Sequence, residues 1–394
     1  MRIETPRYTE RFGAIRLHNV QKVVELDSGG KEFLVCQEVR GVEKIDEEVI
    51  KAIEGRMAIV VPVKDEKLKI FEGVISGIPH DCLLIVVSNS RTEEINRFRM
   101  EKDALEQFCY FAHRPALIIH QKDVLLAEAL QRAGYLDLLG EDGLVRDGKC
   151  EGMIIGLLLA AMAEKEYVGF VDADNYFPGA VFEYVRAYAA GFSLSKSPYI
   201  MVRILWNYKP KISADEIYFK KWGRISEIDN KYFNLLLSAK TSFETDVIKT
   251  ANSGEHAMTM RLAEILPLAS GYTVEPQELI FLFEQFGGAM PTPHQEVVAE
   301  GVDIFQVETR NPHLHEQKGE EHLEHMLIQG LSTIYHSSLC EPPIKEMVLR
   351  ELQGQTSLKP GDEPSKPFIH TPLCEVDLKR FKDFMLPHLP DYSV

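Results

Sequence analysis

Short apolar runs alternate with longer stretches of helical periodicity through the first half of the chain. The runs Met57–Val63, Cys82–Ser88, Ala116–His120 and Tyr167–Val171 contain few polar residues, as expected for strands that are buried on both faces. Helical patterns separate these runs, at residues 68–77, 92–111, 124–133 and 152–165. Strands that alternate with helices at this spacing predict right-handed βαβ units. We therefore expect an α/β fold with a mostly parallel sheet flanked by helices.

The remaining chain extends this core at both ends. Residues 1–55 predict a β-rich extension, with a turn at Asp27-Ser28-Gly29-Gly30 between alternating stretches at 20–26 and 32–39. After residue 190 the pattern predicts strands at 199–205 and 303–308, and helices at 255–266, 277–286, 320–353 (two) and 375–385. The expected division is an extension (1–55), a first α/β half (56–190), a second half (191–320) and a helical C-terminal segment (321–394).

Composition narrows the class of partner. The chain has 394 residues, 45% of them apolar, and its formal net charge is −16. Both nucleic-acid backbones and anionic membranes are negatively charged, so neither is expected as the main partner. An anionic substrate would need a local basic pocket and a cation to oppose the global charge.

Cysteine usage and the lack of targeting segments indicate a cytoplasmic protein. The six cysteines are scattered and form no Cys-x-x-Cys pair, which predicts reduced thiols. The first seven residues contain no apolar core of a secretory signal. The longest apolar run, Met153–Ala163, is too short to cross a bilayer, so no association with a membrane is expected.

The strongest candidate for chemistry is the acidic motif Asp172-Ala173-Asp174, which directly follows the apolar run ending at Val171. Two carboxylates at the mouth of a buried strand are costly to desolvate, and a bound cation is the simplest compensation. The alternative is an ordinary turn, because turns favour aspartate and the pattern is short enough to arise by chance. In open α/β sheets the ligand lies beyond the carboxyl ends of the strands. Residues 62–66, 88–90, 121–123 and 172–175 are therefore expected around one crevice.

A second candidate is Gly148-Lys149, which lies just before the helical pattern that precedes the acidic motif. A glycine beside a lysine at a helix start offers free backbone N–H groups and a positive charge, and both suit a phosphate. An ordinary turn with a solvated lysine remains the alternative.

Two further groups of residues could complete such a site. His313 and His315 lie two positions apart after a strand, where one imidazole could face a metal while the other faces solvent. His322 and His325 lie among glutamates on an expected helix, which favours a solvated face. A basic segment could form a pocket for an anionic acceptor, with a solvated surface as the alternative. Its residues are Lys209, Lys211, Lys220, Lys221 and Arg224.

Several catalytic motifs are absent from the sequence. It contains neither Gly-x-Gly-x-x-Gly nor the P-loop pattern, and neither Gly-x-Ser-x-Gly nor His-Glu-x-x-His. Dinucleotide dehydrogenases, P-loop NTPases, serine hydrolases and zincins are therefore not favoured. A haloacid-dehalogenase-like phosphatase, with Asp172 as nucleophile and Asp174 as acid, stays open, although the motif lies late in the chain for that class.

The order of these segments resembles that of GT-A glycosyltransferases: residues 61–66, Gly148-Lys149, residues 171–174, Gly223-Arg224-Ile225-Ser226 and then His313. The chain is more closely similar to the mannosyl-3-phosphoglycerate synthase family over most of its length, including residues 11–16 and 287–294. Retaining glucosyl-3-phosphoglycerate synthases are similar in three of the segments. Their Gly-Lys-Gly is Gly148-Lys149-Cys150 in this chain, so the third backbone contact differs.

The resemblance implies a GT-A fold and a reaction. Mannose would be transferred from GDP-mannose to the 2-hydroxyl of 3-phosphoglycerate with retention of the anomeric configuration, a step towards the compatible solute mannosylglycerate. No carboxylate stands out as a nucleophile, which favours front-face attack with the leaving phosphate as proton acceptor. The alternatives are another metal-dependent nucleotide-sugar transferase, such as a glucosyl-3-phosphoglycerate synthase, and a nucleotide-binding regulatory module. A homodimer is compatible with the sequence.

The resemblance also implies roles for individual residues. Asp172 and Asp174 would be catalytic, and Asp174 would bind a divalent metal together with His313, or with His315 as the alternative. Oxygen ligands favour Mg²⁺, while an imidazole ligand shifts the preference towards Mn²⁺, Co²⁺ or Zn²⁺. The acceptor would contact Gly223, Arg224, Ile225 and Ser226. The donor would contact Pro62, Val63, Lys64, Asp65, Glu66, Ser88, Lys149, Asp172 and Ala173.

Overall fold

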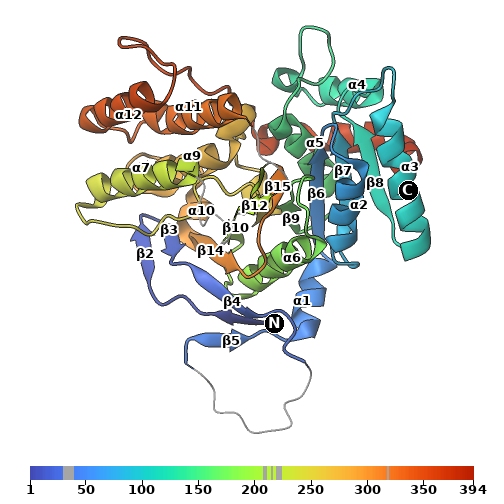
Figure 1. Ribbon diagram of the computed structural model, residues 1–394, viewed down its shortest axis with the longest axis horizontal. Helices are drawn as coiled ribbons and strands as arrows, with labels where there is room; N and C mark the ends of the chain where they lie inside the picture. The colour runs from blue at the N-terminus through green and yellow to red at the C-terminus, as the bar shows by residue number, and fades with distance from the viewer. Residues whose placement is uncertain (30–39, 207–210, 214–215, 219–223, 317–318) are drawn as a thin grey trace.

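A mixed sheet runs through the centre of the molecule, with helices on both of its faces (Figure 1). The computed structural model describes residues 1–29, 40–206, 211–213, 216–218, 224–316 and 319–394; among these, the side chains of 211–213, 216–218, 224 and 316 are not described. The main part of the sheet consists, in spatial order, of β14 (Val302–Thr309), β10 (Tyr199–Trp206), β13 (His256–Thr259), β9 (Tyr167–Phe170), β6 (Met57–Val63), β7 (Leu83–Ser88) and β8 (Ala116–His120).

These strands run in the same direction except for β13, which is antiparallel to β9 and to β10. The mostly parallel α/β fold predicted from the sequence is confirmed. The predicted helix at 255–266 is wrong over its first half, because His256–Thr259 is a fully buried strand and only Met260–Ala263 (α8) is helical. Four buried residues are too few to show a period, so pairing with two neighbouring strands overrides the local helical pattern.

The N-terminal extension widens the sheet. It contains β1 (Arg2–Glu4), β2 (Thr9–Phe12), β3 (Ile15–His18), β4 (Gln21–Glu25) and β5 (Val42–Lys44), followed by α1 (Glu47–Glu54). Both β3 and β4 pair in parallel with β14, and β1 joins β4 to β5. The predicted stretch at 20–26 is confirmed as β4, whereas 32–39 lies outside the described residues.

Alternate residues of the strands point into two separate cores. Val60 and Ile85 pack in one core with α4 (Val124–Arg132), α5 (Lys149–Met162) and α9 (Val274–Phe286). Ile59 and Val86 pack in the other with α1 and with α2 (Leu68–Gly77), α3 (Arg97–Ala112) and α6 (Pro178–Ser193). Burial on both faces explains why these strands appear in the sequence as continuous apolar runs.

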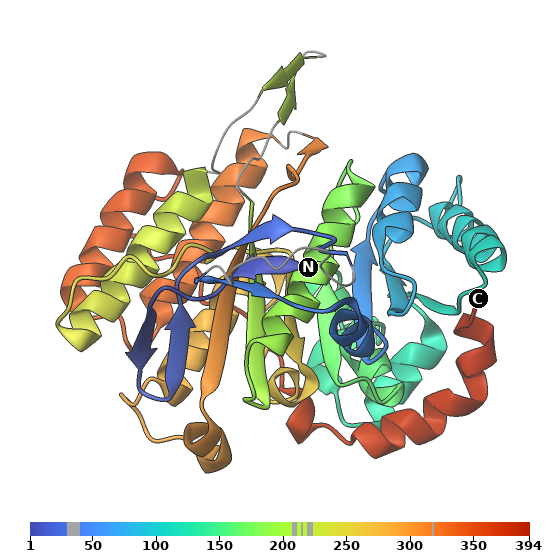
Figure 2. The ribbon, with the colours of Figure 1, turned by 90° about the horizontal axis from the view of Figure 1, so that it is seen from below.

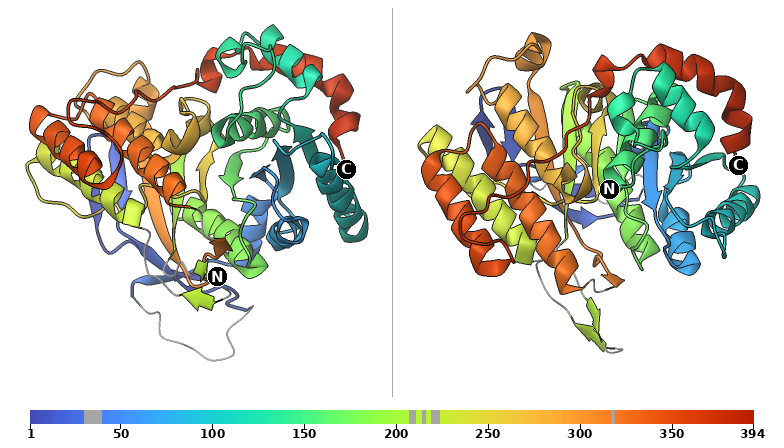
Figure 3. Two further views of the ribbon diagram at one scale, coloured as in Figure 1. Left: turned by 45° about the horizontal axis from the view of Figure 1, so that its top comes forward. Right: turned by 90° about the horizontal axis from the view of Figure 1, so that it is seen from above.

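The C-terminal part is helical, as expected. α7 (Arg224–Thr241), which the sequence pattern did not predict, packs against α11 (Glu320–His336) and α12 (Pro342–Gln355). The chain then crosses the molecule to α13 (Leu378–Met385), which packs on α4 and α5 (Figure 3). Shorter elements are η1 (Leu136–Leu138), η2 (Gly271–Thr273), α10 (Gln295–Glu300), η3 (Leu373–Glu375), η4 (Leu386–His388) and α14 (Leu389–Tyr392).

A small separate sheet projects from the body of the molecule (Figure 2). In it β11 (Lys211–Ser213) pairs with β12 (Glu216–Tyr218) and, in parallel, with β15 (His315–Glu316). Within the part of the chain that the structure describes, every helix is too short or too polar to span a bilayer.

Candidate functional site

The acidic motif lies where β9 leaves the sheet. Val171 still donates a backbone hydrogen bond to the carbonyl of Val60 (3.1 Å), after which the chain becomes a loop that leads to α6. Val171 and Ala173 are buried, whereas Asp172 and Asp174 are half-buried. The alternation therefore directs both carboxylates away from the core, at the carboxyl edge of the parallel strands.

Lys149 connects this loop to two other segments. It is the first residue of α5, and its Nζ lies 2.6 Å from Oδ1 of Asp172 and 3.1 Å from Oε1 of Glu275. The side chains of Lys149 and Asp172 are each about 30% exposed. Burial alone would lower the pKa of Lys149, but Asp172, Glu275 and Glu255 raise it well above its ordinary value. The ammonium therefore stays charged and faces an excess of carboxylates.

Two glycines allow this close packing. A Cβ at Gly254 would lie 2.9 Å from Oδ2 of Asp172 and 3.4 Å from Nζ of Lys149, so the Gly254 backbone forms a wall of the site. A Cβ at Gly148, whose φ is +157°, would collide with the Glu151 carboxylate. The sequence analysis found Gly148 but missed Gly254 and Glu275, which carry no motif. A glycine just before a short buried strand was the one available signal.

The loop that carries Gly148 is held from the end of β8. The side-chain Nε2 of Gln121, which is buried, donates to the carbonyls of Arg146 (2.5 Å) and Gly148 (3.2 Å). Asn89 and Lys122 both contact the carboxylate of Asp147 (3.1 and 3.3 Å). The loops after β7, β8 and β9 thus meet at one edge of the sheet, as the sequence predicted.

The expected donor-side segment after β6 is also at this edge. Val63 is buried, Pro62, Asp65 and Glu66 are half-buried, and Lys64 is exposed. The Asp65 N–H donates to Oγ of Ser90 (2.7 Å). The Ser88 hydroxyl donates to the buried carboxylate of Glu101 (2.7 Å), which also accepts from Ser90 (2.6 Å). Ser88 is therefore connected through Glu101 to Ser90, the residue that holds the loop after β6.

His313 lies beside the acidic loop. The residue is 3% exposed, and its ring stacks on Trp206 with a centroid separation of 4.6 Å. Its Nδ1 is 3.2 Å from Asn175 Nδ2, 3.2 Å from the Tyr184 hydroxyl and 3.6 Å from Glu255 Oε1. The backbone N–H of Tyr176 donates to the carbonyl of Leu314 (2.9 Å). This bond connects the loop after β9 (residues 171–177, the acidic loop) to the loop after β14 (residues 310–314, the histidine loop).

A carboxylate on α6, which the sequence analysis missed, accepts hydrogen bonds from the histidine loop. Glu183 is fully buried and accepts from the backbone N–H groups of Arg310 (2.6 Å) and Asn311 (2.7 Å), and from the Asn311 side chain (2.7 Å). Nothing in the sequence distinguishes this glutamate from those on solvated helix faces. Its contacts position the chain three residues before His313.

The expected acceptor residues are described only in part. Gly223 lies outside the described residues, as do Lys209, Lys220 and Lys221, and the side chain of Arg224 is not described either. Ile225 is buried and Ser226 half-buried, in the first turn of α7. His315 is half-buried in β15, opposite Lys211 of β11, and its ring centroid is 5.2 Å from that of His313.

The described residues do not by themselves supply a full set of ligands for a metal. Among the described residues, no three His, Cys, Asp or Glu side chains gather closely enough to hold a cation. A site with one carboxylate and one imidazole leaves positions for substrate phosphates and water. Mg²⁺ with a nucleotide typically keeps such positions, while the imidazole shifts the preference towards Mn²⁺, Co²⁺ or Zn²⁺. Metal-binding histidines typically have their second ring nitrogen fixed by a partner, and the contacts at Nδ1 of His313 fit that role.

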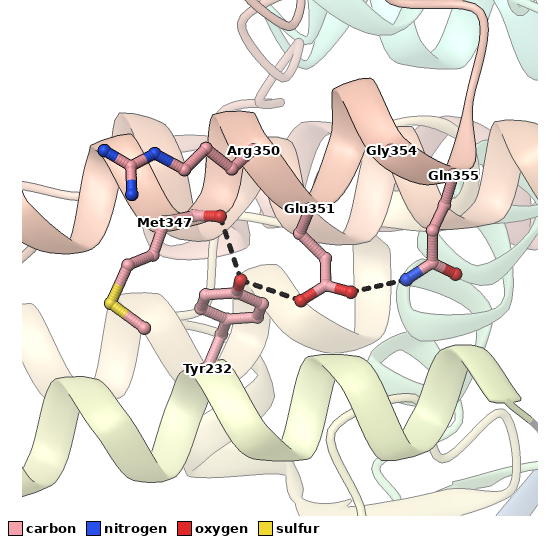
Figure 4. A pocket seen from close by; sticks show the side chains of 6 residues that line it. All are labelled: Tyr232, Met347, Arg350, Glu351, Gly354 and Gln355. Atoms are coloured by element: carbon pink, nitrogen blue, oxygen red, sulfur yellow. Dashed lines mark hydrogen bonds between the residues drawn. The ribbon is translucent and has the colours of Figure 1, made fainter.

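A separate hollow of about 330 Å³ lies between α7 and α12 (Figure 4). Its lining residues are Tyr232, Met347, Arg350, Glu351, Gly354 and Gln355. The Tyr232 hydroxyl lies 3.0 Å from both the Met347 carbonyl and the Glu351 carboxylate, which share its single proton. Tyr232, Glu351 and Gln355 are linked by hydrogen bonds, whereas Arg350 pairs with Glu346, which does not line the hollow. None of these residues belongs to the site described above.

Comparisons with known proteins agree on one family. Residues 5–385 match the family described as mannosyl-3-phosphoglycerate synthase. A mannosyl-3-phosphoglycerate synthase of Pyrococcus furiosus is 47% identical over 97% of this chain and 96% of its own length. One from Aeropyrum pernix is 35% identical over 100% of this chain and 99% of its own.

The fold is also found among solved structures. Glucosyl-3-phosphoglycerate synthase from Mycobacterium tuberculosis, in complex with Mn²⁺, uridine diphosphate and phosphoglyceric acid, superposes with a TM-score of 0.50. The match covers 82% of this chain and 94% of that chain, at 19% identity. At this identity the likeness supports the GT-A fold and nothing further.

Proposed function

The chain belongs to the mannosyl-3-phosphoglycerate synthase family, and from that membership we propose that it transfers mannose from GDP-mannose to the 2-hydroxyl of 3-phosphoglycerate with retention. It is a glycosyltransferase, so the phosphatase considered from the sequence is not retained. The main structural support for the proposal is that Lys149 contacts both Asp172 and Glu275 at the carboxyl edge of the sheet. His313 lies beside the same acidic loop.

Lys149 is the proposed contact for the donor diphosphate. Its ammonium is held charged by two carboxylates at 2.6 and 3.1 Å, and it stands beside Gly148 at the start of α5. A phosphate placed there would gain a point charge and the positive end of a helix. Phosphate oxygens must share this ammonium with Asp172 and Glu275, so binding would loosen at least one of these ion pairs.

Asp172 is proposed to accept hydroxyl hydrogen bonds from the donor ribose or mannose. Its Oδ1 faces Lys149 while Oδ2 faces the Gly254 backbone, so the carboxylate is fixed from two sides. A fixed acceptor orients the sugar without reorganisation during the reaction. Pro62, Val63, Lys64, Asp65, Glu66 and Ala173 complete the proposed donor side, with Ser88 supporting the loop.

Asp174 and His313 are proposed to hold a divalent cation, Mg²⁺ first and Mn²⁺, Co²⁺ or Zn²⁺ as alternatives, with His315 as the alternative imidazole. When bound, the cation would neutralise charge that develops on the leaving diphosphate. Arg224 and its neighbours Gly223, Ile225 and Ser226 are proposed to bind the phosphate or carboxylate of the acceptor. The pairing of β15 with β11 supports this placement, because it connects the histidine loop to the segment that precedes α7.

A coupled assay tests the proposal. The protein is incubated with GDP-mannose, 3-phosphoglycerate and Mg²⁺, and GDP release and the sugar product are measured, with reactions lacking each substrate as controls. GDP release that requires the acceptor, and an α-linked product, are expected. Faster turnover with another nucleotide sugar, such as UDP-glucose, would instead favour the related glucosyl transfer. Absence of turnover with every donor and divalent metal would refute the proposal. Sedimentation of the same sample tests the expected homodimer.

A further inference from the structure

Three polar side chains, two of them buried and one half-buried, form a cluster next to the start of α5. Oε1 of Glu151 accepts from Oγ of Ser270 (2.5 Å) and lies 3.1 Å from Nε2 of His370. The Ser270 oxygen and the same His370 nitrogen are 2.9 Å apart. Glu151 and His370 are each 1% exposed. Burying a carboxylate is costly unless hydrogen bonds compensate for the lost water, so the two partners of Oε1 decide where this side chain can lie.

The cluster joins three segments that are far apart in the sequence. Glu151 lies two residues after Lys149, Ser270 lies five residues before Glu275, and His370 belongs to the connection between α12 and α13. The chain crosses the molecule in that connection (Figure 3). We call residues 368–371 the C-terminal strap. The strap therefore lies against both segments that supply the 3.1 Å contact between Lys149 and Glu275.

Backbone hydrogen bonds fix the strap to the Ser270 side. The N–H of Ser270 donates to the carbonyl of Phe368, and the N–H of His370 donates to the carbonyl of Leu268 (both 2.9 Å). The Ser270 carbonyl in turn accepts from Oγ1 of Thr273 (2.6 Å), at the start of the turn that leads into α9. This side of the strap is therefore rigidly connected to the helix start that carries Glu275.

Other contacts fix the strap to the loop that precedes Lys149. The Arg146 guanidinium lies 4.9 Å from the centroid of the Phe368 ring. The Thr371 N–H and hydroxyl both donate to Asp137 (2.6 and 2.9 Å), and the Tyr135 hydroxyl donates to the Thr371 carbonyl (2.6 Å). The strap thus connects the segment that precedes Glu275 to the loop that precedes Lys149.

Within this bridge, the Glu151 carboxylate is the part that reaches the Gly148 backbone. Its Oε2 is buried with no hydrogen-bond partner among the described residues, and it occupies the space that a Cβ of Gly148 would need. Gly148 also offers no side chain to cap α5. A shift of this carboxylate would therefore move Gly148 or Lys149. The hydrogen bonds to Oε1 fix the carboxylate and, through it, the positions of these two residues.

We propose that Ser270 and His370 are positioning residues for donor binding: by holding the Glu151 carboxylate, they keep Gly148 and Lys149 in the geometry that receives the diphosphate. The inference rests on the proposed function, because it assigns Lys149 to the donor. It predicts that damage to the cluster weakens binding of the nucleotide and leaves the acceptor side unaffected. A merely structural cluster would lower the melting temperature without that selectivity.

The test compares His370→Phe, which removes the hydrogen bond to Glu151, with His370→Gln, whose Nε2 can restore it. Tyr135→Phe is the matched control, since it removes one strap hydrogen bond without touching Glu151. GDP affinity is measured by calorimetry, and KM for each substrate by the coupled assay. His370→Phe should weaken GDP binding and raise the donor KM about tenfold, or about 1.4 kcal/mol. The acceptor KM should be unchanged, His370→Gln should recover most of the affinity, and Tyr135→Phe should behave as wild type.

Three outcomes would overturn the positioning role. One is a folded His370→Phe protein with wild-type GDP affinity. Another is a loss in Tyr135→Phe equal to that in His370→Phe. If His370→Phe does not fold, Ser270→Ala replaces it in the same comparison, and failure of both to fold would assign the cluster to stability alone. A wild-type protein that neither binds GDP nor turns over GDP-mannose would refute the proposed function instead, so the two failures are distinguishable.

Discussion

The ammonium of Lys149 lies 2.6 Å from the carboxylate of Asp172, and this ion pair joins the first turn of α5 to the loop after β9. Replacing Lys149 with a neutral residue would remove the cation that contacts both the Asp172 and the Glu275 carboxylates. Because Lys149 and Asp172 are each about 30% exposed, solvent screens part of this repulsion. The main loss should therefore appear in donor binding.

We predict that Lys149→Ala lowers kcat/KM for the donor by about 30-fold or more, corresponding to about 2 kcal/mol for removal of one partner of a hydrogen-bonded charge pair. The measurement is steady-state kinetics with each substrate varied in turn. Lys69→Ala is the control, since that side chain is 92% exposed and on α2. An acceptor KM that rises more than the donor KM would place Lys149 on the other side of the reaction.

Gly254 gives a second prediction, which concerns shape. A Cβ would lie 2.9 Å from Oδ2 of Asp172, closer than such contacts normally are, so Gly254→Ala should displace the carboxylate. Turnover should fall at least about tenfold, because misplacement by a fraction of an ångström disrupts a positioned group. Gly354→Ala is the matched control, since nothing lies within 4 Å of its Cβ position. Equal activities of the two variants would show that Asp172 tolerates the shift.

The sheet could be predicted from the sequence because its strands are buried on both faces. Residues 57–63 form β6 as expected, since every position but Pro62 is buried and the apolar run is unbroken. Thr259, the last residue of β13, is polar, and that strand has only four residues, so no pattern marked it. Arg224 begins a long helix, α7, which the sequence pattern did not predict because the residues before it are mostly polar and basic.

The site was predictable where a short motif marks it. Asp172 and Lys149 were both expected to contact the donor, and their side chains are in direct contact with each other. Glu275 and Gly254 reach the same place only through packing of α9 and of the loop before β13, which leaves no trace in local sequence. The same holds for Glu183, because the local sequence does not distinguish a buried glutamate that holds a loop from one exposed to solvent.

Glu183 supports a third prediction. It is fully buried and accepts three hydrogen bonds from Arg310 and Asn311. In Glu183→Ala two backbone N–H groups would lose their acceptor, which should cost about 1–3 kcal/mol of stability. If His313 binds the metal, the half-saturating Mn²⁺ concentration should also rise about tenfold, as for other residues that orient metal ligands.

Thermal unfolding and Mn²⁺ titration of activity check these two effects separately. Glu164→Ala is the control, because its carboxylate is 80% exposed and pairs with Lys382 on the surface. A destabilised Glu183→Ala protein with an unchanged metal requirement would favour His315, or no histidine, as the ligand. Retention of full stability would contradict the hydrogen bonding itself.

Asp229 supports the last prediction, which concerns pH. Burial raises the pKa of this carboxyl to about 7, and the hydrogen bond from Asn252 opposes the rise only in part. In the unfolded chain the pKa is about 4. Between these values the folded protein holds a proton that the unfolded chain releases, so the contribution of Asp229 to stability is complete below about pH 4 and is lost as the pH rises to 7. The loss should be up to about 1.4 kcal/mol for each pH unit.

Asp229→Asn cannot titrate and should lack this slope, so its stability relative to wild type should increase from pH 5 to pH 7 and then level off. Urea unfolding of both proteins at pH 5, 6, 7 and 8 measures the difference, and parallel pH profiles would show that Asp229 is ionised in the folded protein throughout.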